Sequence, residues 1–466
     1  MSDYAQFLES KTQLDHAGGF DPVWMPDYLF DFQEMLTTWA IRQGRAALFA
    51  DCGMGKTPMA LVWAHNVYQH TGKPVLIVTP LAVSFQVEQE AHKFNVGAAV
   101  SRDGSIPAPV TITNYERLEK FDSTKFGGVV CDESSAIKSF DGTRRAVVTE
   151  FLRLIQYRLL CTATAAPNDY VELGTSSEAL GHLGHMDMLQ RFFTNRDGHS
   201  NNRLRHRRKG SGGRKGSGAQ AWRFKGHAED AFWRWVSSWA RAIRKPSDYG
   251  FSDDGFNLPP LEHRQHVVEA RQTRPDVLFD LPASGLQEER EETRRTLTER
   301  CEWASEVISD AESAVMWCHL NDESALLAKL TPGAVELSGS DSPEAKEDKL
   351  LAFSRGEIRT LVTKPKIGAW GLNWQHCHRM TYFPSHSYEQ YYQAIRRCWR
   401  YGQTRPVVVD VVTTPGGANT LANLQRKANQ AERMFDSLIA HMTHAIDIQA
   451  TTNYPTQTEV PSWVMS

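Results

Sequence analysis

The sequence predicts an α/β protein of two tandem lobes, each a mostly parallel sheet flanked by helices, with a basic flexible insertion between them. Short β-rich apolar runs recur in two separate blocks, and helical patterns separate the runs. A segment of very different composition lies between the blocks. Buried parallel strands appear as short continuous apolar runs, and parallel neighbours need a crossover that is usually a helix. The pattern therefore favours two sheets in series.

Both blocks are predicted to contain a series of strands separated by helices. The first places strands at 46–50, 75–79, 110–113, 128–132 and 158–164. The second places strands at 263–270, 313–319, 334–339, 358–364, 379–383 and 406–412. We expect a leader (1–25), a first lobe (26–194), the insertion (195–226), a helical linker (227–262), a second lobe (263–448) and a tail (449–466).

The bulk composition is that of a globular protein. The 466 residues suffice for two or three domains, and 41% hydrophobic with 23% charged residues excludes bulk disorder. No apolar run approaches the roughly 20 residues that cross a bilayer, and the first residues do not resemble a secretory signal. The seven cysteines form no CxxC pair, which argues against a zinc ribbon or a disulfide scaffold. We expect a cytoplasmic protein, in a bacterium or a host cell, with no membrane partner.

The insertion between the blocks concentrates positive charge. Residues 195–226 hold ten Lys and Arg residues, and Asp197 is their only acidic residue. Too few apolar side chains are present to offset the entropy of ordering, so we expect a mobile loop. A loop of this kind can neutralise nucleic-acid phosphates, although a solvated linker explains the composition equally well. The candidate contacts are Arg203, Arg205, Arg207, Arg208 and Lys209.

A glycine-rich motif follows the first predicted strand. The segment ADCGMGKT (50–57) lies between an apolar strand and a helical pattern. Glycines allow backbone N–H groups to turn inward around a phosphate, and a helix N-terminus adds partial positive charge. Lys56 would reach the β and γ phosphates, and the Thr57 hydroxyl would ligate Mg²⁺. The strict motif has Gly where Ala50 stands.

Two adjacent carboxylates end a later strand of the same block. In GGVVCDESS (127–135), Asp132 can hold Mg²⁺ and Glu133 can orient or deprotonate an attacking water. An acidic loop after a strand is common, so the order after Lys56 and Thr57 is what makes the pair informative. The motif RLLCTATAAPND (158–169) follows as a third strand with a Thr-Ala-Thr end.

The second block ends in a basic segment. SHSYEQYYQAIRRCWRYGQ (385–403) predicts a helix with Gln393, Arg397 and Arg400. Arg397 and Arg400 are three residues apart, so we expect them to share a helix face and point at one anion. Arginines supplied across a cleft stabilise charge in phosphoryl transfer, whereas the alternative is an ordinary basic surface helix.

The ordered series resembles the superfamily-two helicases, and its ending is most similar to the Swi/Snf-type ATPases. It comprises Gln33, ADCGMGKT, VTPLAVSFQ (78–86), TNYE (113–116), DESS, TAT, KIGAWGLN (366–373) and QAIRRCWRYGQ (393–403), and it covers roughly residues 28–415. The resemblance implies two RecA-like P-loop lobes with ATP and Mg²⁺ in the cleft between them. Ser134, Ser135 and Ala369 depart from the usual pattern.

The resemblance also implies residue roles. Gln33 matches the position that recognises adenine, and Gly53, Met54, Gly55, Lys56 and Thr57 match the phosphate loop. Asp132 and Glu133 match the magnesium and water site, while Arg397 and Arg400 match the pair that senses the γ-phosphate. Gly371 and Gln393 fall in second-lobe elements at the nucleotide cleft. The segments around Pro80, Thr113 and Gly371 match elements that grip nucleic acid or couple that grip to hydrolysis.

These matches predict an ATP-dependent motor that translocates on duplex DNA and remodels or unwinds it. Single-stranded DNA remains an alternative track, and RNA is disfavoured. A strand-separating helicase in replication or recombination is the first alternative function. An ATP-switched DNA-binding subunit of a defence or restriction complex is the second. No nuclease signal accompanies the motifs, so protein partners would supply specificity or cutting. The small size suggests a bacterial or phage protein.

Overall fold

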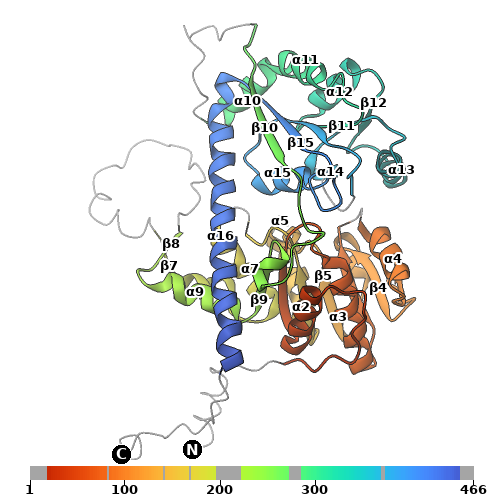
Figure 1. The fold of residues 1–466 in the computed structure, drawn as a ribbon, viewed down its shortest axis with the longest axis vertical. Coiled ribbons are helices and arrows are strands. Elements are labelled where there is room, and N and C mark those ends of the chain that lie inside the picture. The colour runs from red at the N-terminus through yellow and green to blue at the C-terminus, as the bar shows by residue number, and fades with distance from the viewer. Residues whose placement is uncertain are drawn as a thin grey trace, which may run out of the picture.

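A computed structural model describes residues 18–80, 83–139, 142–166, 169–195, 222–271, 285–368 and 373–451. Two parallel sheets flanked by helices lie one above the other, which confirms the predicted α/β class (Figure 1). The polypeptide passes from the first sheet to the second between residues 243 and 261.

The first sheet has seven parallel strands in the order β3-β4-β2-β5-β6-β1-β9. These strands are β1 (Arg45–Ala50), β2 (Val75–Thr79), β3 (Ala98–Val100), β4 (Val110–Asn114), β5 (Gly128–Cys131), β6 (Tyr157–Cys161) and β9 (Ala240–Ile243). All five predicted strands of this block are present. β3 was missed because three residues give no usable pattern. β9 was missed because it lies within 227–262, where we expected only a helical linker.

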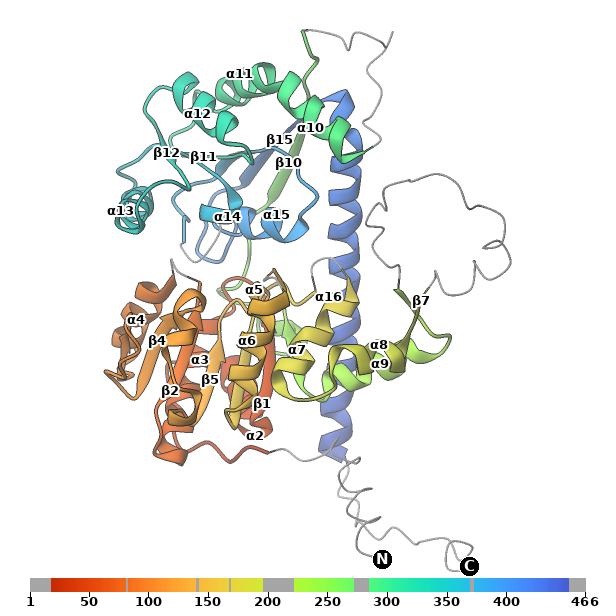
Figure 2. The same ribbon diagram turned by 180° about the vertical axis from the view of Figure 1, so that it is seen from behind.

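Helices cover both faces of the first sheet, as the reverse view makes clear (Figure 2). They are α2 (Asp31–Gln43), α3 (Lys56–Thr71), α4 (Ser84–Lys93), α5 (Ala136–Ser139), α6 (Gly142–Arg153), α7 (Leu173–Leu180), α8 (His185–Phe192) and α9 (Ala228–Ser237). The short hairpin of β7 (Phe193–Asn195) and β8 (Trp222–Phe224) adjoins α8 and α9. Trp233, Trp235 and Trp239 are buried in the core on this side.

The second sheet has six parallel strands in the order β10-β15-β14-β11-β13-β12. They are β10 (Leu261–Val267), β11 (Ala314–Trp317), β12 (Ala334–Leu337), β13 (Thr360–Thr363), β14 (Arg379–Tyr382) and β15 (Val407–Thr413). The six predicted strands of the second block correspond to these six. The surrounding helices are α10 (Leu286–Arg295), α11 (Leu297–Val307), α12 (Asn321–Leu330), α13 (Pro343–Ser354), α14 (Pro365–Gly368) and α15 (Tyr388–Ile395).

The final helix, α16 (Ala418–Thr451), runs alongside both lobes (Figures 1 and 2). Leu421 and Leu424 pack in the core of the second lobe. Phe435 and Leu438, further along the helix, pack in the core of the first lobe. We expected this region to belong to the second lobe. The helix instead packs against both lobes, because apolar side chains continue along it beyond the part that contacts the second lobe.

Two further observations bear on the predicted class of protein. Among the described residues, no helix combines the length and apolar character needed to cross a membrane. All seven cysteines lie in described segments, where each is buried and none forms a disulfide.

Candidate nucleotide site between the lobes

The glycine-rich motif forms a tight loop between β1 and α3. Gly53 and Gly55 have φ angles of 90° and 83°, in the left-handed region that other residues adopt at a cost. A Cβ atom at Gly53 would lie 2.5 Å from Cδ2 of Tyr401, a second-lobe residue. A Cβ at Gly55 would lie 2.1 Å from Nε2 of Gln33. Both positions therefore require glycine for conformation and for space.

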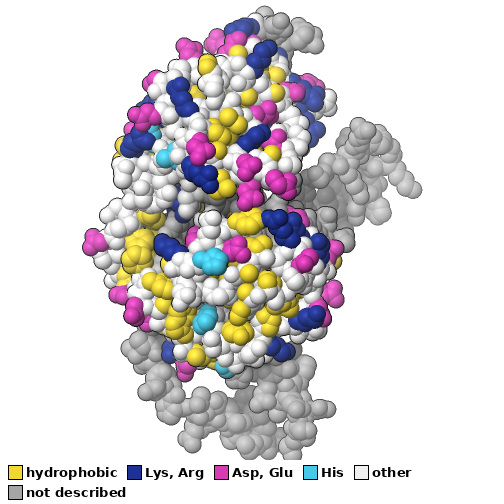
Figure 3. Space-filling view, turned by 90° about the vertical axis from the view of Figure 1, so that its right-hand side faces the viewer, with side chains coloured by type: hydrophobic (Ala, Val, Ile, Leu, Met, Phe, Trp, Pro, Cys, Tyr) yellow, Lys and Arg dark blue, Asp and Glu magenta, His cyan; other side chains and the backbone are white. Residues whose placement is uncertain are grey.

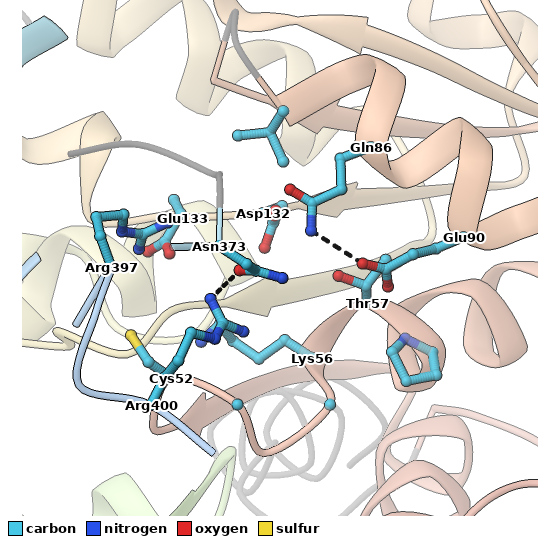
Figure 4. Close-up of a pocket in the computed structure, with 14 residues that line it drawn as sticks. Cys52, Lys56, Thr57, Gln86, Glu90, Asp132, Glu133, Asn373, Arg397 and Arg400 are labelled. Carbon is cyan, nitrogen blue, oxygen red and sulfur yellow. Dashed lines mark hydrogen bonds between the residues drawn. The ribbon is translucent and has the colours of Figure 1, made fainter. Parts of the chain in front are cut away.

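The loop leads directly into the first turn of α3, which begins at Lys56. The Lys56 ammonium donates to the backbone carbonyl of Ala50 at 2.9 Å. Lys56 and Thr57 both line a cleft between the lobes (Figure 4). The cleft thus receives a cation, a hydroxyl and the positive end of a 16-residue helix, which together suit a phosphate chain.

The two carboxylates lie across the cleft from the loop, just after β5. Burial, followed by the neighbouring Glu133 carboxylate, raises the pKa of Asp132 to about 7, and the Lys56 ammonium opposes that rise. The backbone carbonyl of Asp132 accepts a hydrogen bond from the Tyr115 hydroxyl at 2.9 Å. A carboxylate held in this environment favours a bound cation over solvent, which suits Mg²⁺.

Glu133 occupies an unusual backbone conformation. Its φ angle is 47°, and it is one of two non-glycine residues with positive φ in the described chain. Its side chain is buried, and Oε2 accepts hydrogen bonds from Thr162 of the TAT motif and from Gln393 of the second lobe, both at 3.5 Å. Strained residues of this kind are concentrated at functional sites. The Glu133 carboxylate is thus held between the two lobes.

The second lobe supplies Arg397 and Arg400, which line the same cleft (Figure 4). The prediction that they share a helix face is wrong, because α15 ends at Ile395. The Arg397 carbonyl accepts from the Trp374 amide at 2.8 Å, and this bond replaces a further helical turn. The chain bends here, and both arginines still line the cleft, with Arg397 beside Glu133 (Figure 4).

The electrostatics of the arginine pair favour an anion. Burial, with the neighbouring Arg397 as a second cause, lowers the pKa of Arg400 to about 10. Arg400 is hydrogen bonded to the Asn373 side chain, while its Nε is buried and has no hydrogen-bond partner among the described residues. A buried donor without a partner is costly, so an anion in the cleft would relieve it.

Several cleft residues were not predicted from sequence. Gln86 and Glu90 lie one turn apart on α4 and line the cleft opposite the second lobe (Figure 4). Gln86 Nε2 donates to Glu90 Oε1 at 3.0 Å, while Gln86 Oε1 is buried and finds no partner in the part of the chain that the structure describes. Asn373 completes the second-lobe wall. The i, i+4 spacing in SFQVEQE was the available signal, but it is equally typical of a solvated helix face.

Other predicted nucleotide contacts are placed beside the cleft. Gln33 is buried in α2 and donates through Nε2 to the Met54 carbonyl at 3.1 Å. Gln393 is fully buried and accepts from Arg397 at 3.0 Å through Oε1. Gln33 therefore supports the phosphate loop through the buried Met54, and Gln393 supports Arg397, which lines the cleft. Gly371 lies outside the described residues.

Of the predicted nucleic-acid contacts, only Pro80 and Thr113 lie among the described residues, at the ends of the neighbouring strands β2 and β4. Thr113 is buried, and its hydroxyl donates to the Ser101 carbonyl at 3.1 Å, so its side chain is not exposed for contact. Pro80 is half-buried just after β2. Arg203, Arg205, Arg207, Arg208 and Lys209 lie outside the described residues. On the face in Figure 3, acidic and basic side chains are mixed on both lobes.

The residues present fit ATP and Mg²⁺. The glycine turn and the α3 N-terminus suit the phosphates, and Thr57 and Asp132 offer the oxygen ligands that Mg²⁺ prefers. The buried Nε of Arg400, which has no partner within the described segments, is a donor for a phosphate oxygen. The described residues hold no cluster of three or more His, Cys, Asp or Glu side chains that would suggest another metal.

No family model matches the chain. Sequence similarity is found to "Putative protein p41" of Acyrthosiphon pisum secondary endosymbiont phage 1, with 27% identity over 168 residues. That match covers 30% of this chain and 36% of the phage protein. The chain is also 28% identical over 191 residues to the "DNA annealing helicase and endonuclease ZRANB3" of Mus musculus and of Bos taurus. These matches cover 37% of this chain and 17% of either relative.

The chain thus spans about a third of the phage protein and about a sixth of the mammalian proteins. Among solved structures, similarity is found to the "Sulfolobus solfataricus SWI2/SNF2 ATPase core in complex with dsDNA". The identity is 14% and the TM-score 0.40, with 94% of this chain and 99% of the other covered.

Proposed function

We propose that this chain, a Snf2-like member of the superfamily-two helicases, is an ATP-driven motor that translocates on double-stranded DNA. The observation that carries the proposal is the cleft, where the phosphate loop and Asp132-Glu133 of one lobe face two arginines of the other. A site divided between two lobes links the state of the nucleotide to their relative position. That link is what a motor requires.

In this proposal, Thr57 and Asp132 would hold Mg²⁺, which would neutralise charge on the nucleotide phosphates. Glu133 accepts a proton from the attacking water, or orients it, while Lys56 and the backbone of the loop bind the phosphates. Arg397 and Arg400 stabilise the charge that develops on the transferred phosphoryl group. Because these arginines come from the second lobe, hydrolysis removes one reason for the lobes to stay closed.

The choice of duplex DNA as the track rests on similarity and on the motif series. The similar mammalian proteins are described as DNA annealing helicases, and the closing R-x-x-R-x-G-Q phrase (397–403) resembles Swi/Snf-type ATPases. A strand-separating helicase is the second candidate. It is supported by the same cleft, and the two differ in what they do to the track.

A triplex-displacement assay tests the proposal. A third DNA strand is bound to one end of a blunt duplex, and its release is followed with ATP and with a non-hydrolysable analogue. We expect ATP-dependent release of the third strand while the duplex stays paired. Lys56→Ala provides the inactive control. Separation of a forked duplex without triplex displacement would favour the helicase, and ATP hydrolysis without either would refute the motor.

A further inference from the structure

A buried ion pair joins the two lobes immediately beside the phosphate loop. Asp51 is the first residue after β1, and Arg396 is the first residue after α15. Their side chains form an ion pair in which Arg396 is 3% exposed and Asp51 is 7% exposed. Both residues lie inside matched motifs, ADCGMGKT and QAIRRCWRYGQ, but the resemblance assigns a role to neither. The pair is therefore unexplained by the nucleotide contacts themselves.

Both partners are held by further contacts. Asp51 Oδ1 accepts from its neighbouring Cys52 amide at 2.6 Å and also from the Tyr392 hydroxyl of the second lobe. The Arg396 guanidinium stacks over the Trp399 ring, 4.5 Å from its centroid. Trp399 in turn donates to the carbonyl of Pro259, in the connection between the lobes, at 2.7 Å. The ion pair is thus the centre of a larger contact, which we call the Asp51 clasp: Asp51, Tyr392, Arg396 and Trp399.

The clasp adjoins catalytic candidates on both sides. Asp51 is followed directly by the loop containing Gly53, against which the second-lobe Tyr401 ring packs. Arg397 follows Arg396 directly, and Arg400 lies three residues beyond Arg397. A shift at the clasp would therefore move both arginines relative to the phosphate loop. Burial lowers the pKa of Arg396 to about 10, so its guanidinium is charged at neutral pH.

A buried pair of this kind selects one docked arrangement. Leaving either charge buried without the other is strongly unfavourable, so the lobes dock with the two groups together or not in this way at all. The contacts of the clasp are all between protein groups, so its formation does not require a nucleotide. Docking at the Asp51 clasp would bring Arg397 and Arg400 toward their positions in the cleft before ATP binds.

We propose that Arg396 is a positioning residue for ATP hydrolysis: by holding Asp51, it docks the arginine segment of the second lobe on the phosphate loop. This inference rests on the proposed ATPase activity. It assigns Arg396 a task distinct from those of Arg397 and Arg400, because Arg396 is turned toward the end of β1 and does not line the cleft.

The test uses Arg396→Gln, Asp51→Asn and the double variant in the full chain. Lobe docking is measured by energy transfer between dyes at Glu119→Cys and Asp348→Cys, two exposed positions on opposite lobes. The native cysteines are all buried, so the dyes react with the new thiols. Arg355→Gln is the matched control, because Arg355 is an exposed second-lobe arginine whose ion pair with Glu357 stays within that lobe.

We expect Arg396→Gln to change energy transfer in the nucleotide-free protein and to lower kcat by about 10²-fold, the usual effect of an ångström-scale displacement at a site. The KM for ATP should change by less than about threefold, since the phosphate loop is untouched. The double variant should be no slower than the slower single variant, because both remove one contact. Arg355→Gln should match the wild type.

Wild-type energy transfer and kcat in Arg396→Gln would overturn the inference, as would single-variant effects that multiply in the double variant. If Arg396→Gln fails to fold, Asp51→Asn takes its place, and unchanged docking and kcat there would count equally against the clasp. A wild type that hydrolyses no ATP would refute the proposed function. The energy-transfer comparison would still decide whether Arg396 docks the lobes.

Discussion

Replacing Gly53 by Ala tests whether the lobes meet as closely at the phosphate loop as the structure indicates. Gly53 has a φ angle of 90°, and an alanine Cβ there would lie 2.5 Å from Cδ2 of Tyr401. Ordinary contacts of a Cβ atom begin at 3.4 Å, so the ring or the loop must move by nearly 1 Å. Tyr401 cannot swing away freely, because its hydroxyl donates to the Arg244 carbonyl at 2.9 Å.

Gly53→Ala is expected to lower both the stability of the protein and its kcat. The left-handed conformation costs alanine about 1–2 kcal/mol relative to glycine. The displacement of the second-lobe segment should lower kcat by about 10²-fold, since it carries the arginines away from the phosphate loop. Gly250→Ala is the matched control, because Gly250 has a φ angle of 80° with nothing within 4 Å of the added Cβ. Gly250→Ala therefore has the cost of a left-handed alanine without a contact like the one between Gly53→Ala and Tyr401.

The assay is steady-state ATP hydrolysis at saturating duplex DNA, together with a thermal melt of each variant. We expect both variants to melt below the wild type, and only Gly53→Ala to lose most of its kcat. Equal rates for Gly53→Ala and Gly250→Ala would refute the cross-lobe contact at Tyr401. A loss of rate in both would mean that reduced stability, rather than the position of the second lobe, governs the rate.

Three further changes probe the cleft chemistry. Glu133→Gln should lower kcat by about 10²–10⁴-fold while nucleotide binding persists, since it removes the proton acceptor; single-turnover hydrolysis checks this. Arg397→Ala should lower kcat by about 10³-fold or more, with Mg²⁺-dependent binding of a fluorescent nucleotide nearly unchanged. Since the pKa of Asp132 is about 7, that binding should weaken as pH falls below 7, because protons then compete with Mg²⁺. Asp132→Asn should bind weakly at every pH, and a wild-type pH slope in that variant would contradict the assignment.

Much of the fold could be predicted because parallel strands are buried on both faces. The runs 75–78 and 407–409 are continuous in Val, Ile and Leu, so the strands that contain them are evident. β9 escaped prediction because ARAI (240–243) is short and carries Arg241, which is buried over the Trp39 ring at 4.2 Å. The docking of α16 on both lobes depends on tertiary packing, which its helical periodicity does not specify.

The candidate site, like the fold, could be predicted only in part from the sequence. The phosphate loop and Asp132-Glu133 are local sequence motifs, so the amino-acid sequence alone indicates their chemistry. The positions of Gln86 and Glu90 depend on how α4 lies beside the loop. The end of α15 depends on a bond from the Trp374 amide to the Arg397 carbonyl, which joins residues distant in sequence. The Asp51–Arg396 pair joins residues of different lobes, and no local pattern indicates it.

Steady-state ATP hydrolysis by the wild type and by Lys56→Ala tests whether the chain is an ATPase that duplex DNA stimulates. Rates are measured without nucleic acid and with duplex DNA, single-stranded DNA or RNA. We expect duplex DNA to stimulate the wild type most strongly and Lys56→Ala to abolish the activity. Stimulation by single strands alone would favour the strand-separating helicase. A wild-type rate that no nucleic acid changes would contradict a DNA-driven motor.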